Sequence, residues 1–341
     1  MMETRGHIWH YLSVPIAFSD RTMSVPAATS GDDSDTSSAE GAAFRNFFGG
    51  ESSDSDEDND KNGRIERKEP VERPIQQDVY EQREILHVLI EEQTVGGSIA
   101  HRLWPAAEYL ATFVMDCYHG KITQETFQRS STDRRLEDVS LALRQQALGS
   151  LKIILKSYPV IPILELGAGI GLTGLEIATQ LQSHVLLTEM DVGLPLLYRN
   201  TELNQDRFAL GKDAARPQRL EWSSSQDRDK ALGWYRQVAE DQQPLLILAS
   251  DCVYWEVTHK PLEETLAHLL SELPINSICL LAGERRWKRD NTFYQTLGKH
   301  SRTQTHTLHC TSLQETIRRD GDSRQVMRVY AVQWLPIETQ E

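Results

Sequence analysis

The chain has 341 residues and a formal net charge of −14 at pH 7. Residues 31–60 hold ten acids and one base, a net charge of −9, so all the other residues together carry only −5. That balanced remainder offers no broad basic surface for nucleic acid. No apolar run approaches the ~20 residues that a membrane span needs. We therefore expect neither nucleic acid nor a membrane as a partner.

The composition divides the chain into a polar N-terminal part and a folded part. Residues 1–19 are a short segment of unknown role, and residues 20–75 are an acidic tail or linker that is predicted to be disordered. Residues 76–160 contribute a strand and helices to the folded part, and residues 161–341 form its core.

Cysteine and histidine usage gives two further expectations. The four cysteines contain no CxxC pair, which predicts reduced thiols and a location in the cytoplasm, with the nucleus as a second compartment. The segment His306-x-x-His309-Cys310 has a faint likeness to a metal site, but it alternates like a strand, so we expect no bound metal.

Alternating patterns of apolar residues predict an α/β fold. Before residue 160 we expect a strand at 83–93, a helix at 103–118, a loop at 120–136 and a helix at 138–157. From residue 161, strands are expected at 161–166, 184–188, 219–222, 245–250 and 277–282, with helices at 171–182, 192–204, 261–272 and 290–299. Two alternating segments, 304–310 and 326–334, close the chain. This order predicts a mostly parallel, doubly wound sheet with helices on both faces and an antiparallel C-terminal edge.

The most informative segment is 162–174, in which an apolar run leads to an acid and then to four glycines. It is typical of a buried parallel strand that turns sharply into a helix and brings glycine backbone close to a ligand. The spacing Gly169-x-Gly171-x-x-Gly174 also satisfies the dinucleotide fingerprint, which is weak evidence on its own. Glu165 argues against a dinucleotide, because a carboxylate beside this loop repels a pyrophosphate. The same charge suits S-adenosylmethionine, which carries an amino group and a sulfonium.

Ligands of such sheets bind at the carboxyl ends of the strands, and several polar residues are expected there. The second strand delivers Glu189, an acid suited to ribose hydroxyls. The third delivers Trp222, which either stacks on an adenine or packs as an ordinary half-buried tryptophan. The fourth is followed by Asp251 and, three residues later, Tyr254. A carboxylate after six apolar residues must lie at the rim of the sheet, so we interpret Asp251 as functional.

Six segments, in order, resemble the family-16 methyltransferases, seven-β-strand enzymes that use S-adenosylmethionine and mostly modify side chains of non-histone proteins. The likeness covers roughly residues 84–335 and is carried by 87–93, 103–107, 165–171, 188–189, 220–222 and 251–254. Segment 285–293 is also similar to an Arg-x-x-x-Arg-Asp-Asn-x-Phe stretch of the lysine-modifying branch. The resemblance implies a Rossmann-like seven-stranded methyltransferase sheet, in which 76–160 belong to the catalytic domain and 161–341 are its S-adenosylmethionine-binding core.

The resemblance also implies which residues bind the methyl donor. Besides Glu165, the expected contacts are Trp104, Gly167, Ala168, Gly169, Glu189, Trp222 and Ser250. Ser250 stands where the family usually has alanine or glycine, and Glu189 is longer than the common aspartate. The acidic tail and the 120–136 insertion have no family counterpart, so the choice of substrate stays open. The expected partner is a non-histone protein, with a chaperone or an ATPase as candidates, and we expect a monomer.

The hypothesis for the chemistry is transfer of a methyl group to a lysine amine, which must first lose a proton. Asp251 is expected to orient the amine, directly or through water, and Tyr254 to line the channel. The segment lacks the two prolines of the Asn/Asp-Pro-Pro-Tyr motif, which argues against a nucleobase acceptor. Arginine and histidine stay open as acceptors, and Glu108 is a candidate to join Asp251 in gripping a guanidinium.

Two alternatives belong to other functional classes. One is a non-catalytic scaffold that binds the methyl donor and acts through its acidic tail, with Ser53 and Ser55 as switch sites. The other is a nicotinamide-dependent oxidoreductase, which the glycine spacing alone allows.

Overall fold

The structure is a computed structural model that describes residues 79–95, 98–122, 137–286, 290–299, 301–320 and 323–337. The predictions for segments 1–19 and 20–75, and for most of the 120–136 loop, lie outside these residues. No helix in the described part is long and apolar enough to cross a membrane. Nor does that part contain a group of three His, Cys, Asp or Glu side chains able to hold a metal ion.

A seven-stranded sheet forms the centre of the fold, with the strand order β5-β4-β3-β6-β7-β9-β8. Its strands are β3 (Ile161–Leu166), β4 (Ser183–Glu189), β5 (Ala215–Arg219), β6 (Leu246–Ser250), β7 (Ile278–Glu284), β8 (His306–Asp320) and β9 (Ser323–Pro336). The first five are parallel, and β9 is antiparallel to both of its neighbours. The predicted mostly parallel sheet with an antiparallel C-terminal edge is therefore confirmed, with β9 inserted between β7 and the edge strand β8.

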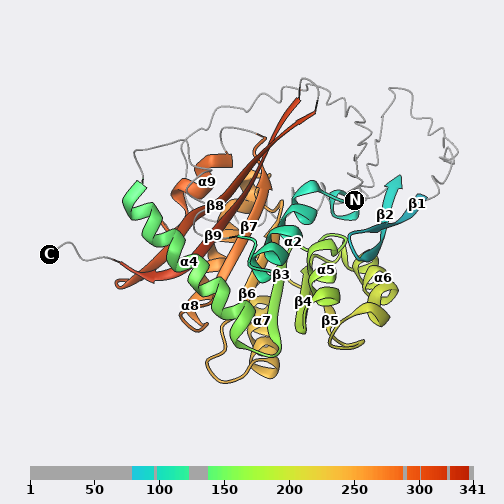
Figure 1. Ribbon diagram of the computed structural model, residues 1–341, viewed down its shortest axis with the longest axis horizontal. Helices are drawn as coiled ribbons and strands as arrows, with labels where there is room; N and C mark the ends of the chain where they lie inside the picture. Colours follow the sequence, from blue (N-terminus) through green and yellow to red (C-terminus); the bar gives the residue numbers. More distant parts are fainter. Residues whose placement is uncertain are drawn as a thin grey trace, which may run out of the picture. The chain divides into compact units, whose positions relative to one another are not determined.

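Helices cover both faces of this sheet (Figure 1). The apolar cluster on one face includes side chains of α2 (Pro105–Tyr118), α4 (Glu137–Ser157), α5 (Leu172–Gln180) and α6 (Leu194–Asn204). The cluster on the other face includes α7 (Ser225–Val238), α8 (His259–Ser271) and α9 (Asp290–Thr296). Successive residues of a strand point to opposite faces, so Ile163 joins the first cluster and Leu164 the second. Three single turns, η1 (Ile99–His101), η2 (Gln205–Arg207) and η3 (Glu256–Thr258), complete the described elements.

The strand predicted at 83–93 is wrong, because this segment belongs to a two-stranded hairpin of β1 (Val79–Ile85) and β2 (Val88–Val95). The chain reverses at Leu86 and His87, where Leu86 takes a positive φ of 56°. A left-handed leucine is uncommon, and no glycine marks the turn in the sequence.

Two asparagines of α6 bind the free edge of β2. Asn204 pairs with the backbone of Leu89 (both bonds 2.7 Å), and Asn200 pairs in the same way with Glu91 (2.8 and 3.0 Å). The Asn200 amide also donates to the carbonyl of Ile170 in the glycine turn (2.9 Å). The side chains thus replace a third strand for a hairpin that is marginal on its own.

The strand predicted at 219–222 is also wrong. The structure places β5 at Ala215–Arg219, so Trp222 lies in the loop beyond it. This strand is defined by its pairing with β4 rather than by an apolar pattern, and it contains Pro217, which an edge strand tolerates. The polar sequence of α7 gave no helix prediction, although Ser224 caps it by accepting a hydrogen bond from the backbone N–H of Asp227. The other predicted strands and helices lie within a few residues of their expected bounds, and β8 and β9 extend beyond theirs.

Candidate active site

The glycine turn after β3 lies at the point where the sheet order reverses, between β3 and β6. We call this edge of the sheet the crevice, because the ligands of such sheets bind there. Gly167, Gly169 and Gly171 all have positive φ, of 58°, 54° and 89°. A Cβ at Gly167 would lie 3.0 Å from Cys252 Sγ and 3.3 Å from the Trp222 ring. The turn therefore requires glycine for its backbone conformation, and at Gly167 also for space.

Glu165 lies beneath this turn and is fully buried. Its Oε2 accepts the backbone N–H of Gly174 in the first turn of α5 (2.9 Å), a position where a helix favours negative charge. Burial raises the pKa of Glu165 to about 8, against the lowering effect of that hydrogen bond. Among the described residues, no hydrogen-bond partner reaches its Oε1. Glu165, the acid expected beside the glycines, therefore has one oxygen bonded to the start of α5 and one oxygen without a hydrogen-bond partner among the described residues.

Glu189, the last residue of β4, faces the same turn from the neighbouring strand. Its Oε2 accepts the backbone N–H of Gly169 and its Oε1 that of Met190, both at 2.8 Å. Burial raises its pKa, and the two hydrogen bonds oppose this. A carboxylate has about four lone-pair sites, so Glu189 keeps acceptor capacity for a hydroxyl of a ligand.

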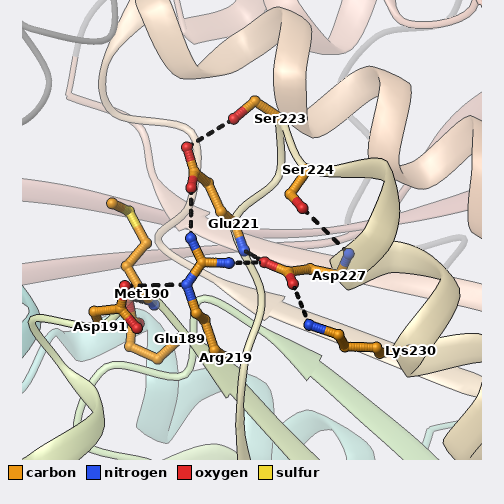
Figure 2. A network of polar contacts seen from close by, with 9 residues as sticks. All are labelled: Glu189, Met190, Asp191, Arg219, Glu221, Ser223, Ser224, Asp227 and Lys230. Carbon is orange, nitrogen blue, oxygen red and sulfur yellow. Dashed lines mark hydrogen bonds and ion pairs between the residues drawn. The ribbon is translucent and has the colours of Figure 1, made fainter.

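Arg219, opposite Glu189 in the register of β4 and β5, organises the loops at this end of the crevice (Figure 2). Its Nε donates to Asp191 (3.0 Å), and one terminal nitrogen donates to Glu221 (2.7 Å). The other terminal nitrogen donates to Asp227, whose side chain is 1% exposed. The guanidinium therefore joins the loop after β4, the loop after β5 and the start of α7.

Trp222 is fixed by the same loop. Its carbonyl accepts hydrogen bonds from Arg228 and from Thr265 of α8, both at 2.9 Å. Its ring lies against Gly167, as the short distance to a Cβ built there shows. Ala168, next in the turn, donates its N–H to the carbonyl of Thr188 on β4 (2.9 Å). The indole thus forms one wall of the crevice rather than a part of the deep core.

Asp251 follows β6 at the opposite end of the crevice, with a positive φ of 57°. Its N–H donates to the carbonyl of Ala282 on β7 (2.8 Å). Both of its carboxylate oxygens accept from Arg286, at 2.8 and 2.6 Å. The Arg286 guanidinium carbon lies 5.2 Å from the centroid of the Trp104 ring, and its Nε is 3.7 Å from Glu284 Oε2. Arg286 therefore joins β6, β7 and the start of α2.

The remaining predicted site residues lie around Asp251. Ser250 ends β6, and its carbonyl is 3.6 Å from the buried Cys252 sulfur. Tyr254 has an exposed ring, and burial of part of the side chain together with the charges of Cys252, Glu189 and Asp251 raises its pKa. Its hydroxyl is consequently a proton donor at neutral pH.

The structure thus brings the predicted residues to one edge of the sheet, although their contacts with a ligand stay predictions. Sequence reasoning missed Arg219, Glu284 and Arg286 as members of the site. The guanidinium beside Asp251 is accompanied by Glu284, and the pairing of Glu108 with Asp251 stays a prediction. The basic run after β7 was a signal for Arg286, because that strand ends beside β6.

The strand order, the glycine turn and the acids at the strand ends define a Rossmann-like α/β fold of the ligand-binding type. The sequence pattern of a family described as lysine methyltransferase matches residues 82–300. The chain belongs to that family.

Individual relatives are similar to only part of the chain. Protein N-lysine methyltransferase METTL21A of Mus musculus is 35% identical over 134 residues, which are 38% of this chain and 52% of that protein. Protein-lysine N-methyltransferase EFM6 of Saccharomyces cerevisiae is 32% identical over 145 residues, which are 40% of this chain and 55% of that protein. This chain spans about half the length of the curated relatives it matches.

A solved structure, that of P. horikoshii TYW2 in complex with MeSAdo, has a TM-score of 0.39 and 14% identity. It covers 75% of this chain and 72% of its own, and a likeness of this size supports no inference.

The residues of the crevice fit S-adenosylmethionine. The glycine turn has three positive φ angles, Glu189 keeps acceptor capacity, and Trp222 supplies an aromatic wall beside Gly167. The acid Asp251 adds negative charge beside Glu189, whereas Glu165 is largely protonated at neutral pH because burial raises its pKa to about 8. That charge suits a ligand with a sulfonium and an ammonium, and it opposes the pyrophosphate of a dinucleotide.

Proposed function

We propose that this protein is an S-adenosylmethionine-dependent methyltransferase that N-methylates a lysine side chain of another protein. One observation carries the proposal: three acids, Glu165, Glu189 and Asp251, lie around a glycine turn at the point where the order of the sheet reverses. The membership of the lysine methyltransferase family and the names of the relatives support the choice of acceptor.

The bound donor supplies an electrophilic methyl group, and the task of the chain is to position the two reactants. Glu189 holds hydroxyl groups of the donor, and the Trp222 ring covers its aromatic part. Asp251 orients the incoming amine, while the neutral hydroxyl of Tyr254 lines the approach. Because the lysine is cationic near pH 7, it must pass its proton to water or to a neighbouring ionised carboxylate before it attacks.

A comparison of ligands tests donor binding. S-adenosylhomocysteine should raise the melting temperature of the purified protein with the logarithm of its concentration above the dissociation constant, and NAD should leave it unchanged. A shift with NAD and none with S-adenosylhomocysteine would overturn the proposal and favour an oxidoreductase.

A second experiment tests the acceptor. The protein is incubated with labelled S-adenosylmethionine and an extract of cells that lack it, and the labelled peptides are sequenced by mass spectrometry. A methylated lysine supports the proposal and identifies the host protein. Labelled arginine or histidine would contradict lysine as the acceptor, but the assignment of the protein as a methyltransferase would stand.

Arginine is the second candidate acceptor, and the Asp251–Arg286 pair favours it. A carboxylate that already binds both terminal nitrogens of a guanidinium has the right geometry for an arginine substrate. Amino-acid analysis of the labelled product separates the two candidates.

The identity of the substrate belongs to the same proposal. We propose a non-histone protein, with chaperones and ATPases as the first to test, and a monomeric enzyme of the cytoplasm and nucleus. Deleting residues 20–75 separates the enzyme from the scaffold alternative: a scaffold loses its partner, whereas an enzyme keeps its methyl transfer. Gel filtration with light scattering measures the oligomeric state.

A further inference from the structure

Arg286 lies in a nest formed by Asp251, Glu284 and the Trp104 ring. Two of its nitrogens bind the Asp251 carboxylate (2.8 and 2.6 Å), its Nε lies 3.7 Å from Glu284, and its guanidinium carbon lies 5.2 Å from the ring centroid. These contacts place two carboxylates and an aromatic ring beside one cation.

The walls of this nest are fixed independently of Arg286. The backbone N–H of Asp251 is bound to β7, Glu284 is the last residue of β7, and the Trp104 indole donates to the carbonyl of Ile99 (3.0 Å). Arg286 itself lies beyond the strand, outside any helix or strand, and its side chain is 28% exposed. Its side chain can therefore leave without breaking the sheet.

The nest has the chemistry that binds an ammonium group. An ammonium offers three donors to carboxylate oxygens and is attracted to the face of an indole. The side chain of Asp251 is 7% exposed, and both of its oxygens are already bonded to Arg286. A substrate amine can therefore bind Asp251 only by displacing the guanidinium of Arg286.

We propose that this nest is the binding place of the acceptor ammonium, and that Arg286 occupies it until the substrate lysine displaces it. This inference rests on the proposed function, in which Asp251 orients a lysine. It makes Arg286 a residue that sets acceptor affinity, because every substrate cation competes with it.

The direct test uses n-butylammonium chloride as a probe for the lysine side chain. The readout is the NMR signal of the Trp104 indole N–H, assigned by its loss in Trp104→Phe, with S-adenosylhomocysteine present and ionic strength held constant. In Arg286→Met the probe should half-saturate the signal change at about one tenth of the concentration that the wild type needs. Arg236→Met, which removes an exposed arginine of α7 with a partner at 3.7 Å, should behave like the wild type.

Neutral n-pentanol, of similar size, should leave the signal unchanged in all three proteins. Equal half-saturation in the wild type and Arg286→Met would overturn the proposal, as would an equal response to n-pentanol.

The second arm measures transfer of label to extract proteins. Arg286→Met should lower the extract concentration for half-maximal rate several-fold, with the affinity for S-adenosylhomocysteine unchanged. Loss of transfer at unchanged affinity would overturn the proposal, because Arg286 would then be needed beside Asp251 during the reaction. If the wild type transfers no label while the tenfold difference in probe binding persists, the proposed function fails and the cation site stands.

Discussion

The two ends of the crevice each hold an arginine, Arg219 as the last residue of β5 and Arg286 two residues beyond β7, but their ion pairs differ. Arg219 spreads its three nitrogens over carboxylates from three segments, Asp191, Glu221 and Asp227 (Figure 2). Arg286 directs both terminal nitrogens to the single carboxylate of Asp251.

The two arginines also differ in the contacts that remain when the guanidinium is removed. Without Arg219, the buried Asp227 keeps only Lys230 (3.1 Å) as an ionic partner among the described residues, and three segments lose their common bond. Without Arg286, one carboxylate at the rim becomes available to another cation. We infer that the first end is a permanent frame for the donor and the second an exchangeable site for the acceptor.

Asp251→Asn should produce the largest effect, because it removes the charge from the acceptor end and keeps the size of the side chain. We expect the rate of methyl transfer to fall by about 100-fold, since misplaced reactants lose about that much. The affinity for S-adenosylhomocysteine, measured by calorimetry, should change little. A rate within threefold of the wild type would remove Asp251 from the chemistry.

Arg219→Met should act on the donor end instead. We expect the dissociation constant of S-adenosylhomocysteine to rise about tenfold, equivalent to about 1.4 kcal/mol. The free energy of unfolding, measured by urea denaturation, should fall by about 1–3 kcal/mol, because the buried carboxylate of Asp227 loses a partner. At saturating donor the rate should be unchanged, and Arg236→Met is the matched control. A lower rate with unchanged donor affinity would show that the two ends are not separate.

Glu165→Gln tests whether the buried Glu165 makes the stability of the protein depend on pH. The folded-state pKa of about 8 lies above the ordinary 4.5, so between these values the folded state holds a proton that the unfolded chain has lost. The free energy of unfolding should therefore fall as the pH rises from 5 to 8, by at most about 1.4 kcal/mol per pH unit. The glutamine variant cannot ionise, and its stability should lack this slope. Calorimetric melting at four pH values measures both proteins, and parallel curves would contradict the assignment.

Tyr254→Phe should have the smallest effect. The ring remains to line the approach, and only the neutral hydroxyl is lost, so we expect a fall in rate of about threefold, the scale of one modest hydrogen bond. Initial rates at saturating donor measure it. A fall as large as that of Asp251→Asn would give the hydroxyl a direct part in the reaction.

The sequence predicted those parts of the fold that local pattern controls. Strands β3, β4, β6 and β7 are apolar runs, because each is buried within the sheet. Strand β5 and helix α7 were mispredicted or missed, because the first is defined by its pairing and the second by a polar sequence with a capping serine.

The candidate site divides in the same way. Glu189 and Asp251 were located by their positions after apolar strands, which fix where a side chain meets the rim. Arg219 and Arg286 were not assigned, because their ion pairs reach the loops that follow neighbouring strands, and the order of those strands decides which loops meet. The sequence pattern also did not predict that the Glu165 side chain accepts a hydrogen bond from the first turn of α5.

The two carboxamides of α6 that bind β2 give the molecule a mechanical connection. Asn200 holds the hairpin through Glu91 and the glycine turn through Ile170 at the same time. A displacement of β2 relative to α6 therefore disturbs the backbone of the glycine turn through this side chain.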